Sequence, residues 1–337
     1  LTSCATALLE YQLDDFAEKF KEFLSEEEIV LAYKKGLESI KKIKRFIDNY
    51  GNHCHFALRP TLIYTNSFLT KSKLKQEYEF RKNHGFDCLF IDKHNNPFTF
   101  PIKAGIFCAN GGAELNPYLF TKQMIENSQN QNHIFENTKI EKIVKDDFDK
   151  IIAITNYGYK ITCKKLILAT GFNWEVINEE NLCDRFVSYS IVTAPIKNLN
   201  HYKKTLVHDT DDPYHYLRQL PNNRLIFGGE DIPMNVKTGI DEKTATKMYQ
   251  KLESDLKTLF PHLEDQIKIE YKFCGAFAST QNNLGLIGES ETKNIYYFIS
   301  CANGIINAMF GTELLEMLFQ NKSHPLAKAF SPTRTPI

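Results

Sequence analysis

A short apolar segment that stops at Ala-Thr-Gly places the strongest constraint on how this chain folds. In KKLILATG, residues 164–171, the strand-like run that begins at Leu166 ends at Ala169, Thr170 and Gly171. Buried strands of this kind are typical of parallel sheets, where a glycine lets the backbone come close to a nucleotide. The 337 residues nevertheless contain no G-x-G-x-x-G for such a strand to serve. Taken alone, the segment is equally consistent with an ordinary buried strand followed by a turn.

Size and charge narrow the class of protein. A chain of 337 residues with 42% hydrophobic content buries a large core and is expected to form about two domains. The 41 basic residues balance the 41 acidic ones, which disfavours nucleic acid and anionic membranes as partners. No apolar run approaches the roughly 18 residues that a membrane span needs, and the N-terminus lacks a signal-like pattern. We therefore expect a globular, cytoplasmic protein with no membrane span.

The cysteines and histidines do not indicate a metal site or a disulfide framework. Eight cysteines are scattered along the chain without a C-x-x-C pair, so buried free thiols are predicted. His53 and His55 form an H-x-H, but no carboxylate or third histidine lies nearby to complete a metal shell.

The periodicity of apolar residues predicts helices and strands in mixed blocks. Ser25 with Glu28 makes a capping box for a long amphipathic helix that ends at Gly51. Further helices are expected from about residue 72 to 84 and from Pro117 onward. Later segments share strand-like composition or helical periodicity and close with a strand, an Asn-Gly turn and a helix. They are strands at 133–146, 150–158, 159–171, 188–195, 214–220, 224–231 and 267–277, a helix at 243–260, and the closing unit at 294–319.

Four segments, in this order along the chain, resemble the FAD-dependent oxidoreductases of the D-amino-acid oxidase (DAO) family. They are LTSCATALLEYQLDD at 1–15, GAELNPYLFT at 112–121, KLILATG at 165–171, and TQNNLGLIG with CANGI at 280–288 and 301–305. The resemblance implies an α/β (mixed α+β) fold in which a Rossmann-like FAD-binding domain is interleaved with an antiparallel-sheet substrate domain.

The resemblance also implies how the two domains divide the chain. The FAD-binding domain is assigned residues 1–50, 117–175 and 285–337, and the substrate-binding domain residues 51–116 and 176–284. The family's first strand, glycine-rich turn, helix and acidic ribose-binding residue, a unit of about 30 residues, are expected upstream of the first residue. That residue is not Met, so we expect the chain to be an excerpt or a processed product, and residues 1–337 alone to hold FAD weakly.

The cofactor contacts implied by the resemblance lie in small or glycine-containing turns. They are Ser3, Thr6, Ala7, Ile140, Ala169, Thr170, Gly171, Asn303, Gly304 and Ile305. Glycine at the end of the strand gives the backbone room beside the pyrophosphate, and the helix after Asn303 is expected to stabilise negative charge on reduced flavin. Simple helix capping by Ser3, Thr6 or Asn303 is the alternative interpretation.

Departures from the family pattern affect the expected substrate. Cys301 and Ala302 replace two glycines, which predicts crowding near the flavin, and Asn282 and Gly285 replace an Asp and a Pro. Phe277 stands where amino-acid-oxidising members often carry an arginine for the substrate carboxylate.

Two arginines and two tyrosines on strand-like segments are the predicted substrate contacts. They are Arg59, Tyr64, Tyr216 and Arg218. Because Phe277 cannot hold a carboxylate, Arg218 with Tyr216 is predicted to orient an anionic or polar group of the substrate. For each of the four, a partly exposed surface position is the alternative.

The resemblance implies FAD-dependent oxidation of a small amine or amino acid. In the family's reaction a hydride passes from the C–H bond beside nitrogen to flavin N5, and water hydrolyses the resulting imine. No catalytic residue is assigned, because the cofactor performs the difficult step. A non-catalytic, degenerate or split-gene member that acts as a binding or partner module is the alternative. A nicotinamide-dependent dehydrogenase is disfavoured, since no segment resembles a second dinucleotide site.

Overall fold

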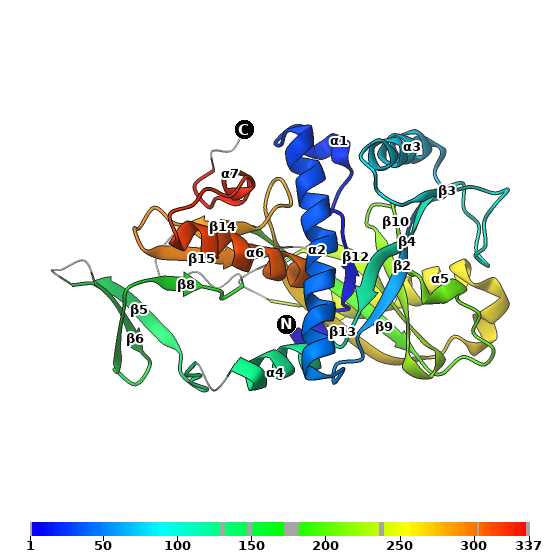
Figure 1. The fold of residues 1–337 in the computed structure, drawn as a ribbon. Coiled ribbons are helices and arrows are strands. Elements are labelled where there is room, and N and C mark those ends of the chain that lie inside the picture. Colours follow the sequence, from blue (N-terminus) through cyan, green and yellow to red (C-terminus); the bar gives the residue numbers. More distant parts are fainter. Residues whose placement is uncertain are drawn as a thin grey trace.

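The computed structural model describes residues 2–128, 132–146, 150–171, 182–235, 239–301 and 303–334. Within these residues one large sheet is accompanied by two sheets of three strands each (Figure 1). The strands of the large sheet are β1 (Leu8–Glu10), β2 (Ala57–Thr65), β3 (Leu89–Ile91), β4 (Ala104–Glu114), β9 (Asp184–Thr193), β10 (Leu206–Asp209), β11 (His215–Leu220), β12 (Arg224–Pro233) and β13 (Ile269–Ser279).

The large sheet is antiparallel at every described pairing except that of β2 with β10. Its order is β1-β4-β2-β10-β11-β12-β9-β13, with β3 added on β4. Alternate residues point to opposite faces. One face buries residues such as Leu217 and Phe227 under helix α5 (Glu242–Leu259), and the other contributes Ile63 and Ile106 to the core that contains helix α2. The antiparallel sheet predicted for the substrate domain is thus present.

The long helix α2 (Glu26–Tyr50) lies between the large sheet and helix α6 (Gly304–Phe319) (Figure 1). The predicted capping box is confirmed, since Ser25 accepts a hydrogen bond from the backbone N–H of Glu28 and the Glu28 carboxylate accepts one from that of Ser25. Glu313 of α6 forms ion pairs with Lys35 and Lys42, at 2.5 and 2.6 Å, which fix the two helices together.

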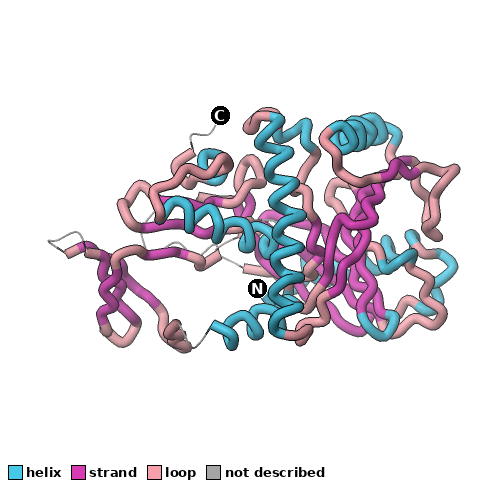
Figure 2. The backbone as a smooth tube through the Cα atoms, viewed as in Figure 1, coloured by secondary structure: helices cyan, strands magenta, loops and turns pink. Residues whose placement is uncertain are grey.

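The two smaller sheets come from the middle and the end of the chain. One has the order β14-β15-β8, from β14 (Leu286–Glu289), β15 (Ile295–Ile299) and β8 (Leu166–Leu168), with β8 parallel to β15. The other is the antiparallel meander of β5 (Ile140–Lys145), β6 (Ile151–Thr155) and β7 (Lys160–Cys163), which projects at one edge of the molecule (Figure 2). The single strand predicted over residues 159–171 is therefore wrong, because the chain bends at Lys164 and passes from one sheet to another.

The remaining helices are short or lie at the edges. They are α1 (Ala17–Phe20), α3 (Phe68–Asn83), α4 (Pro117–Ser128), α7 (Ala327–Phe330) and the 3₁₀ helices η1 (Thr2–Cys4), η3 (Tyr202–Lys204), η4 (Pro221–Asn223) and η5 (Pro261–Gln266). Helix α4 begins at Pro117 as predicted, whereas α3 begins four residues before the predicted start because Ser67 caps it. No helix in the described part of the chain is long and apolar enough to cross a membrane.

A buried ion pair anchors the chain just after β1. Arg81 donates from Nε to Glu77 at 2.7 Å, and its terminal nitrogen lies 3.2 Å from the Tyr11 hydroxyl. Tyr33 of α2 donates to the same Glu77 carboxylate at 2.9 Å. These contacts hold the backbone at Tyr11, and so set where the neighbouring side chains at positions 10 and 12 project.

Candidate active site

One face of the large sheet carries a row of polar side chains. His208 lies opposite Tyr216, Tyr216 opposite Gly228, and Gly228 opposite Ser190, and directly opposed residues share a face. The Tyr216 hydroxyl lies 3.1 Å from the hydroxyls of both Ser188 and Ser190. Glycine at 228 makes this possible, because a Cβ there would lie 2.5 Å from the tyrosine ring.

Glu10 at the end of strand β1 and Gln12, two residues beyond it, add to this polar face. Oε2 of Glu10 lies 2.9 Å from His208 Nδ1 and accepts a 2.9 Å hydrogen bond from the Gln12 amide. Glu10 is only 8% exposed and Gln12 only 5%. Oε1 of each side chain is buried and has no hydrogen-bond partner among the described residues. Each of the two side chains therefore has one buried acceptor oxygen that receives no hydrogen bond from the described residues.

Two aspartates complete what we call the acidic cluster: Glu10, Gln12, Asp14, His208 and Asp231. Desolvation raises the pKa of Asp14 to about 6, with His208 acting in the opposite direction and the carboxylates of Glu10 and Asp231 adding to the rise. Burial likewise raises the pKa of Asp231, against hydrogen bonds from Ser188 and Tyr214 that lower it. Oδ1 of Asp231 is a third buried acceptor without a partner in the described structure.

His208 is the cation of this cluster. Burial lowers the pKa of His208, but the charge and hydrogen bond of Glu10, together with Asp209 and Asp14, outweigh that effect and raise it. Glu10 and Asp14 act on this imidazole and Asp231 acts on Asp14, so the cluster has an excess of negative charge when Asp14 and Asp231 are ionised.

The turn before α6 is tied directly to the acidic cluster. Asn303 adopts a left-handed conformation, with φ of 52°, and its side-chain amide donates to the backbone carbonyls of Glu10 and Gln12 at 2.8 and 3.2 Å. It makes no capping hydrogen bond, so the simple capping interpretation is wrong for Asn303. The first N–H groups of α6, at Gly304 and Ile305, have no partner within the helix.

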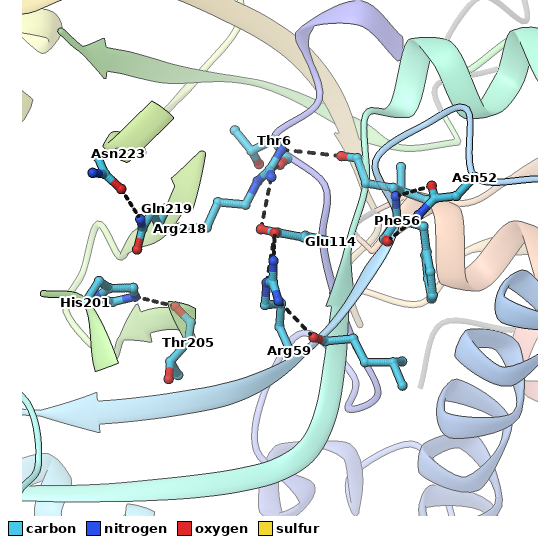
Figure 3. Close-up of polar contacts among 12 residues, drawn as sticks. Thr6, Asn52, Phe56, Arg59, Glu114, His201, Thr205, Arg218, Gln219 and Asn223 are labelled. Carbon is cyan, nitrogen blue, oxygen red and sulfur yellow. Dashed lines mark hydrogen bonds and ion pairs between the residues drawn. The ribbon is translucent and has the colours of Figure 1, made fainter. Parts of the chain in front are cut away.

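The predicted arginines form a separate network around Glu114 (Figure 3). Arg218 donates to the backbone carbonyls of Thr6 and Leu115, at 2.6 and 3.4 Å, and to Oε2 of Glu114 at 3.2 Å. Arg59 holds the other oxygen of Glu114 through two nitrogens, at 2.7 and 2.8 Å. Both oxygens of Glu114 are thus engaged. The substrate role of Arg59 and Arg218 stays a prediction, and their observed contacts are to the protein.

The two tyrosines predicted to contact the substrate, and Phe277 in place of the family's carboxylate-binding arginine, make contacts of their own. Tyr64 packs in the core on the α5 face, 5.1 Å from the Phe100 ring, whereas Tyr216 is on the opposite face; a substrate role for Tyr64 stays a prediction. Phe277 stacks on Phe186 with ring centroids 5.8 Å apart. Phe186 shares its face of β9 with Ser188, so this aromatic pair forms an apolar wall beside the polar row.

The predicted cofactor residues gather in three turns. Because β8 and β15 are parallel, Ala169–Gly171 and the turn at Asn303 follow the same edge of their sheet. Ala169 and Thr170 are exposed, and Gly171 has a left-handed φ of 66°. The third turn, at Thr6 and Ala7, is held by Arg218.

Two further residues predicted to contact the cofactor, Ile140 and Ser3, lie outside these three turns. Ile140 is half-buried at the start of β5, paired with Thr155, in the meander. Ser3 lies in η1, and its side chain is outside the described residues, as is Ala302. The cofactor role of each predicted residue stays a prediction.

A second charged cluster lies on the α5 face of the sheet. His215 is within 3.0 Å of carboxylate oxygens from both Asp209 and Glu230, and Asp255 lies 3.5 Å away. The Lys251 ammonium binds Glu230 and so supplies a cation of the protein's own. A cavity of about 580 Å³ lies elsewhere again, and no predicted site residue lines it.

Sequence reasoning missed the acidic cluster although it singled out the segment that carries three of its five residues. Glu10, Gln12 and Asp14 all lie in LTSCATALLEYQLDD. Polar residues that alternate with Leu9, Tyr11 and Leu13 look like the solvent side of a strand, and only the contacts to His208 and Asn303 show that Glu10 and Gln12 are buried.

A model of the FAD-dependent oxidoreductases called DAO matches residues 2–317. The chain belongs to this family. The family, the mixed α/β fold, FAD as cofactor and the oxidoreductase class, all predicted from the sequence, are confirmed. A search of curated proteins by sequence gave no match.

Solved structures of low sequence identity share the fold of this DAO-family chain. A glycine oxidase from Geobacillus kaustophilus superposes with a TM-score of 0.79 at 16% identity, covering 100% of this chain and 89% of that one. An L-proline dehydrogenase from P. horikoshii gives 0.79 at 16% identity, with 99% and 87% covered. An FAD-bound L-α-glycerophosphate oxidase from Mycoplasma pneumoniae gives 0.74 at 15% identity, with 96% and 86% covered.

Proposed function

We propose that this protein oxidises an amine or amino acid with FAD, using the acidic cluster and the polar row of Tyr216, Ser188 and Ser190 as its substrate side. The observation that carries the proposal is the pair of hydrogen bonds from Asn303 to the carbonyls of Glu10 and Gln12. Through them, the turn predicted to contact the flavin touches the segment that holds three of the cluster's side chains. Oxidases and dehydrogenases of amino acids among the structural neighbours support the substrate class.

The described residues fit FAD at three places. Ala169 and Thr170 are exposed beside a left-handed Gly171, which gives backbone access for a pyrophosphate. The free N–H groups and positive dipole end of α6 suit negative charge on the flavin. Thr6 and Ala7 form the third contact, with Ala7 at a left-handed φ of 53°. When bound, FAD supplies the acceptor for a hydride from the C–H bond beside the substrate nitrogen.

The chain's own groups bind, orient and hold protons. Asn303 fixes the Glu10–Gln12 backbone against α6, and Arg218 fixes the Thr6 loop, so both sides of the site are held by hydrogen bonds. Glu10 keeps a proton on Nδ1 of His208, because its carboxylate accepts the hydrogen bond there. The wall of Phe186 and Phe277 excludes water from the side of the polar row.

Anaerobic flavin reduction tests this function. In the FAD-loaded protein, some member of a panel of primary amines, secondary amines and amino acids is expected to bleach the flavin absorbance. Asn303→Ala removes both hydrogen bonds and is expected to slow this reduction at least about tenfold, which corresponds to about 1.4 kcal/mol. Asn321→Ala is the matched control, because Asn321 is also left-handed, with φ of 56°, but follows the end of α6. A fully loaded protein that no panel member reduces would contradict the proposal.

A further inference from the structure

Three acceptor oxygens in the acidic cluster define what kind of ligand the site takes. Oε1 of Glu10, Oε1 of Gln12 and Oδ1 of Asp231 are buried without a hydrogen-bond partner among the described residues. A carboxylate accepts hydrogen bonds and donates none. The hydrogen bond from the Gln12 amide nitrogen to Glu10 identifies the other amide atom of Gln12 as the oxygen, which is an acceptor. Buried polar atoms of a folded protein are nearly always paired, so such orphans call for a donor from outside the chain.

Charge selects a cation rather than a neutral donor. Glu10, Asp14 and Asp231 outnumber the single imidazolium of His208. A carboxylate ligand would meet these acids, and the two arginines predicted for it from the described sequence, Arg59 and Arg218, are both bonded to Glu114. The acids therefore favour a positively charged ligand and disfavour an anionic one.

The surroundings of the cluster favour an organic cation. Ser188 hydrogen-bonds both Asp231 and Tyr216, and two residues away on the same face Phe186 stacks on Phe277. An apolar wall beside acceptor oxygens matches a molecule with an ammonium at one end and a hydrocarbon part at the other. A metal ion would use the oxygens but gain nothing from the aromatic pair.

We propose that the acidic cluster binds the ammonium group of an amine that carries no carboxylate beside its nitrogen, so that the substrate class is simple amines rather than amino acids. This rests on the proposed function. The three N–H donors of an ammonium match the three orphan oxygens in number and in charge. Transfer of one ammonium proton to the Asp231 carboxylate, whose Oδ1 is one of the three orphan oxygens, leaves a neutral amine and a neutral acid, and the neutral amine is the form that loses hydride.

The test compares benzylamine with benzoate in the FAD-loaded protein, by isothermal titration and by the flavin difference spectrum. Benzylamine is expected to bind at least tenfold more tightly than benzoate. Glu10→Gln and Asp231→Asn are each expected to weaken benzylamine at least tenfold and to leave benzoate unchanged or improved. Asp48→Asn, which removes a surface carboxylate at the end of α2, is the control and is expected to change neither.

The outcomes separate this inference from the function. Tighter binding of benzoate, or benzylamine affinity that is indifferent to both variants, overturns the inference. Micromolar binding of zinc or calcium chloride that depends on Glu10 and Asp231, with no binding of benzylamine, also overturns it. If one variant does not fold, the other and the wild-type preference still decide. Cluster-dependent binding of benzylamine without flavin reduction by any amine or amino acid contradicts the proposed function and leaves the binding site established.

Discussion

Two buried glutamates, Glu10 on β1 and Glu114 on the paired strand β4, differ in how completely they are bonded. Glu114 of β4 is paired with Leu8, and both of its oxygens are bonded to arginines. Glu10 of β1 is paired with Gly112, and one of its oxygens has no partner in the described structure. Burial of charge alone therefore does not identify a site. Both oxygens of Glu114 are bonded to arginines, whereas the acidic cluster contains acceptor oxygens without a partner in the described structure.

Breaking the arginine network is expected to have the largest effect on the free energy of unfolding. Glu114→Gln leaves the guanidinium of Arg218, only 7% exposed, without its charge partner. Removing one member of a buried ion pair costs about 3–5 kcal/mol, because the other charge stays buried. Urea unfolding should show a loss of this size in Glu114→Gln. A loss below about 1 kcal/mol would mean that the network is no structural anchor.

Crowding the polar row is expected to have the second-largest effect on the free energy of unfolding. Gly228→Ala places a Cβ where it meets the Tyr216 ring, so the tyrosine must move away from Ser188 and Ser190. Overpacking of this kind costs about 1–3 kcal/mol, and the displaced ring is also expected to weaken substrate binding. Gly158→Ala provides the comparison, since a Cβ at Gly158 meets nothing within 4 Å, although its positive φ of 80° adds local strain. Equal KM values for Gly228→Ala and wild type would remove Tyr216 from the site.

Changing the acidic cluster is expected to affect stability least. Glu10→Gln keeps the shape of the side chain and removes a charge, so the free energy of unfolding should change by less than about 1 kcal/mol at pH 7. The effect depends on pH, because Glu10 helps to raise the pKa of His208 in the folded state. A raised histidine pKa gives stability that is present below about pH 6.5 and is lost as pH rises through the folded pKa.

The pH dependence of the free energy of unfolding therefore distinguishes the acidic cluster from the arginine network. Urea midpoints of the wild type should include a fall between about pH 6.5 and the folded pKa of His208, and Glu10→Gln should lack this component. NMR titration of His208 provides the direct measurement, and its pKa should drop in Glu10→Gln. An unchanged histidine titration would show that Glu10 and His208 are not coupled.

Ionisation of Asp14 gives the smallest and most specific signal. With a pKa of about 6, Asp14 is largely neutral at pH 5 and ionised at pH 7. Benzylamine, which keeps its charge over this range, is expected to bind several-fold more tightly at pH 7 than at pH 5, and Asp14→Asn should flatten that difference. Affinity that is constant across this range in the wild type would exclude Asp14 from the cluster's binding role.

Local signals predicted much of the fold. The capping box of Ser25 and Glu28 and the position of Pro117 are short-range features, and both helices begin where they indicated. The break at Lys164 was missed because a run of strand-forming residues continues on both sides, and only pairing with different sheets separates β7 from β8.

The site was harder to predict because its contacts join distant parts of the chain. Arg218 was predicted to orient an anionic or polar group of the substrate, and its carboxylate partner Glu114, which lies 104 residues away, was not foreseen. Glu10 and Gln12 show their role only through His208 and Asn303. Residue type and spacing indicated the family and the segments, but the pairing of donors and acceptors depends on tertiary structure.

A crystal structure of the FAD-loaded protein with benzylamine tests the central claim most directly. The account predicts the isoalloxazine ring against the turn at Asn303 and the benzylamine nitrogen within hydrogen-bond distance of Glu10 or Asp231. A nitrogen bound on the opposite face of the sheet, beside Tyr64 and the α5 core, or a ring that does not approach Asn303, would contradict it.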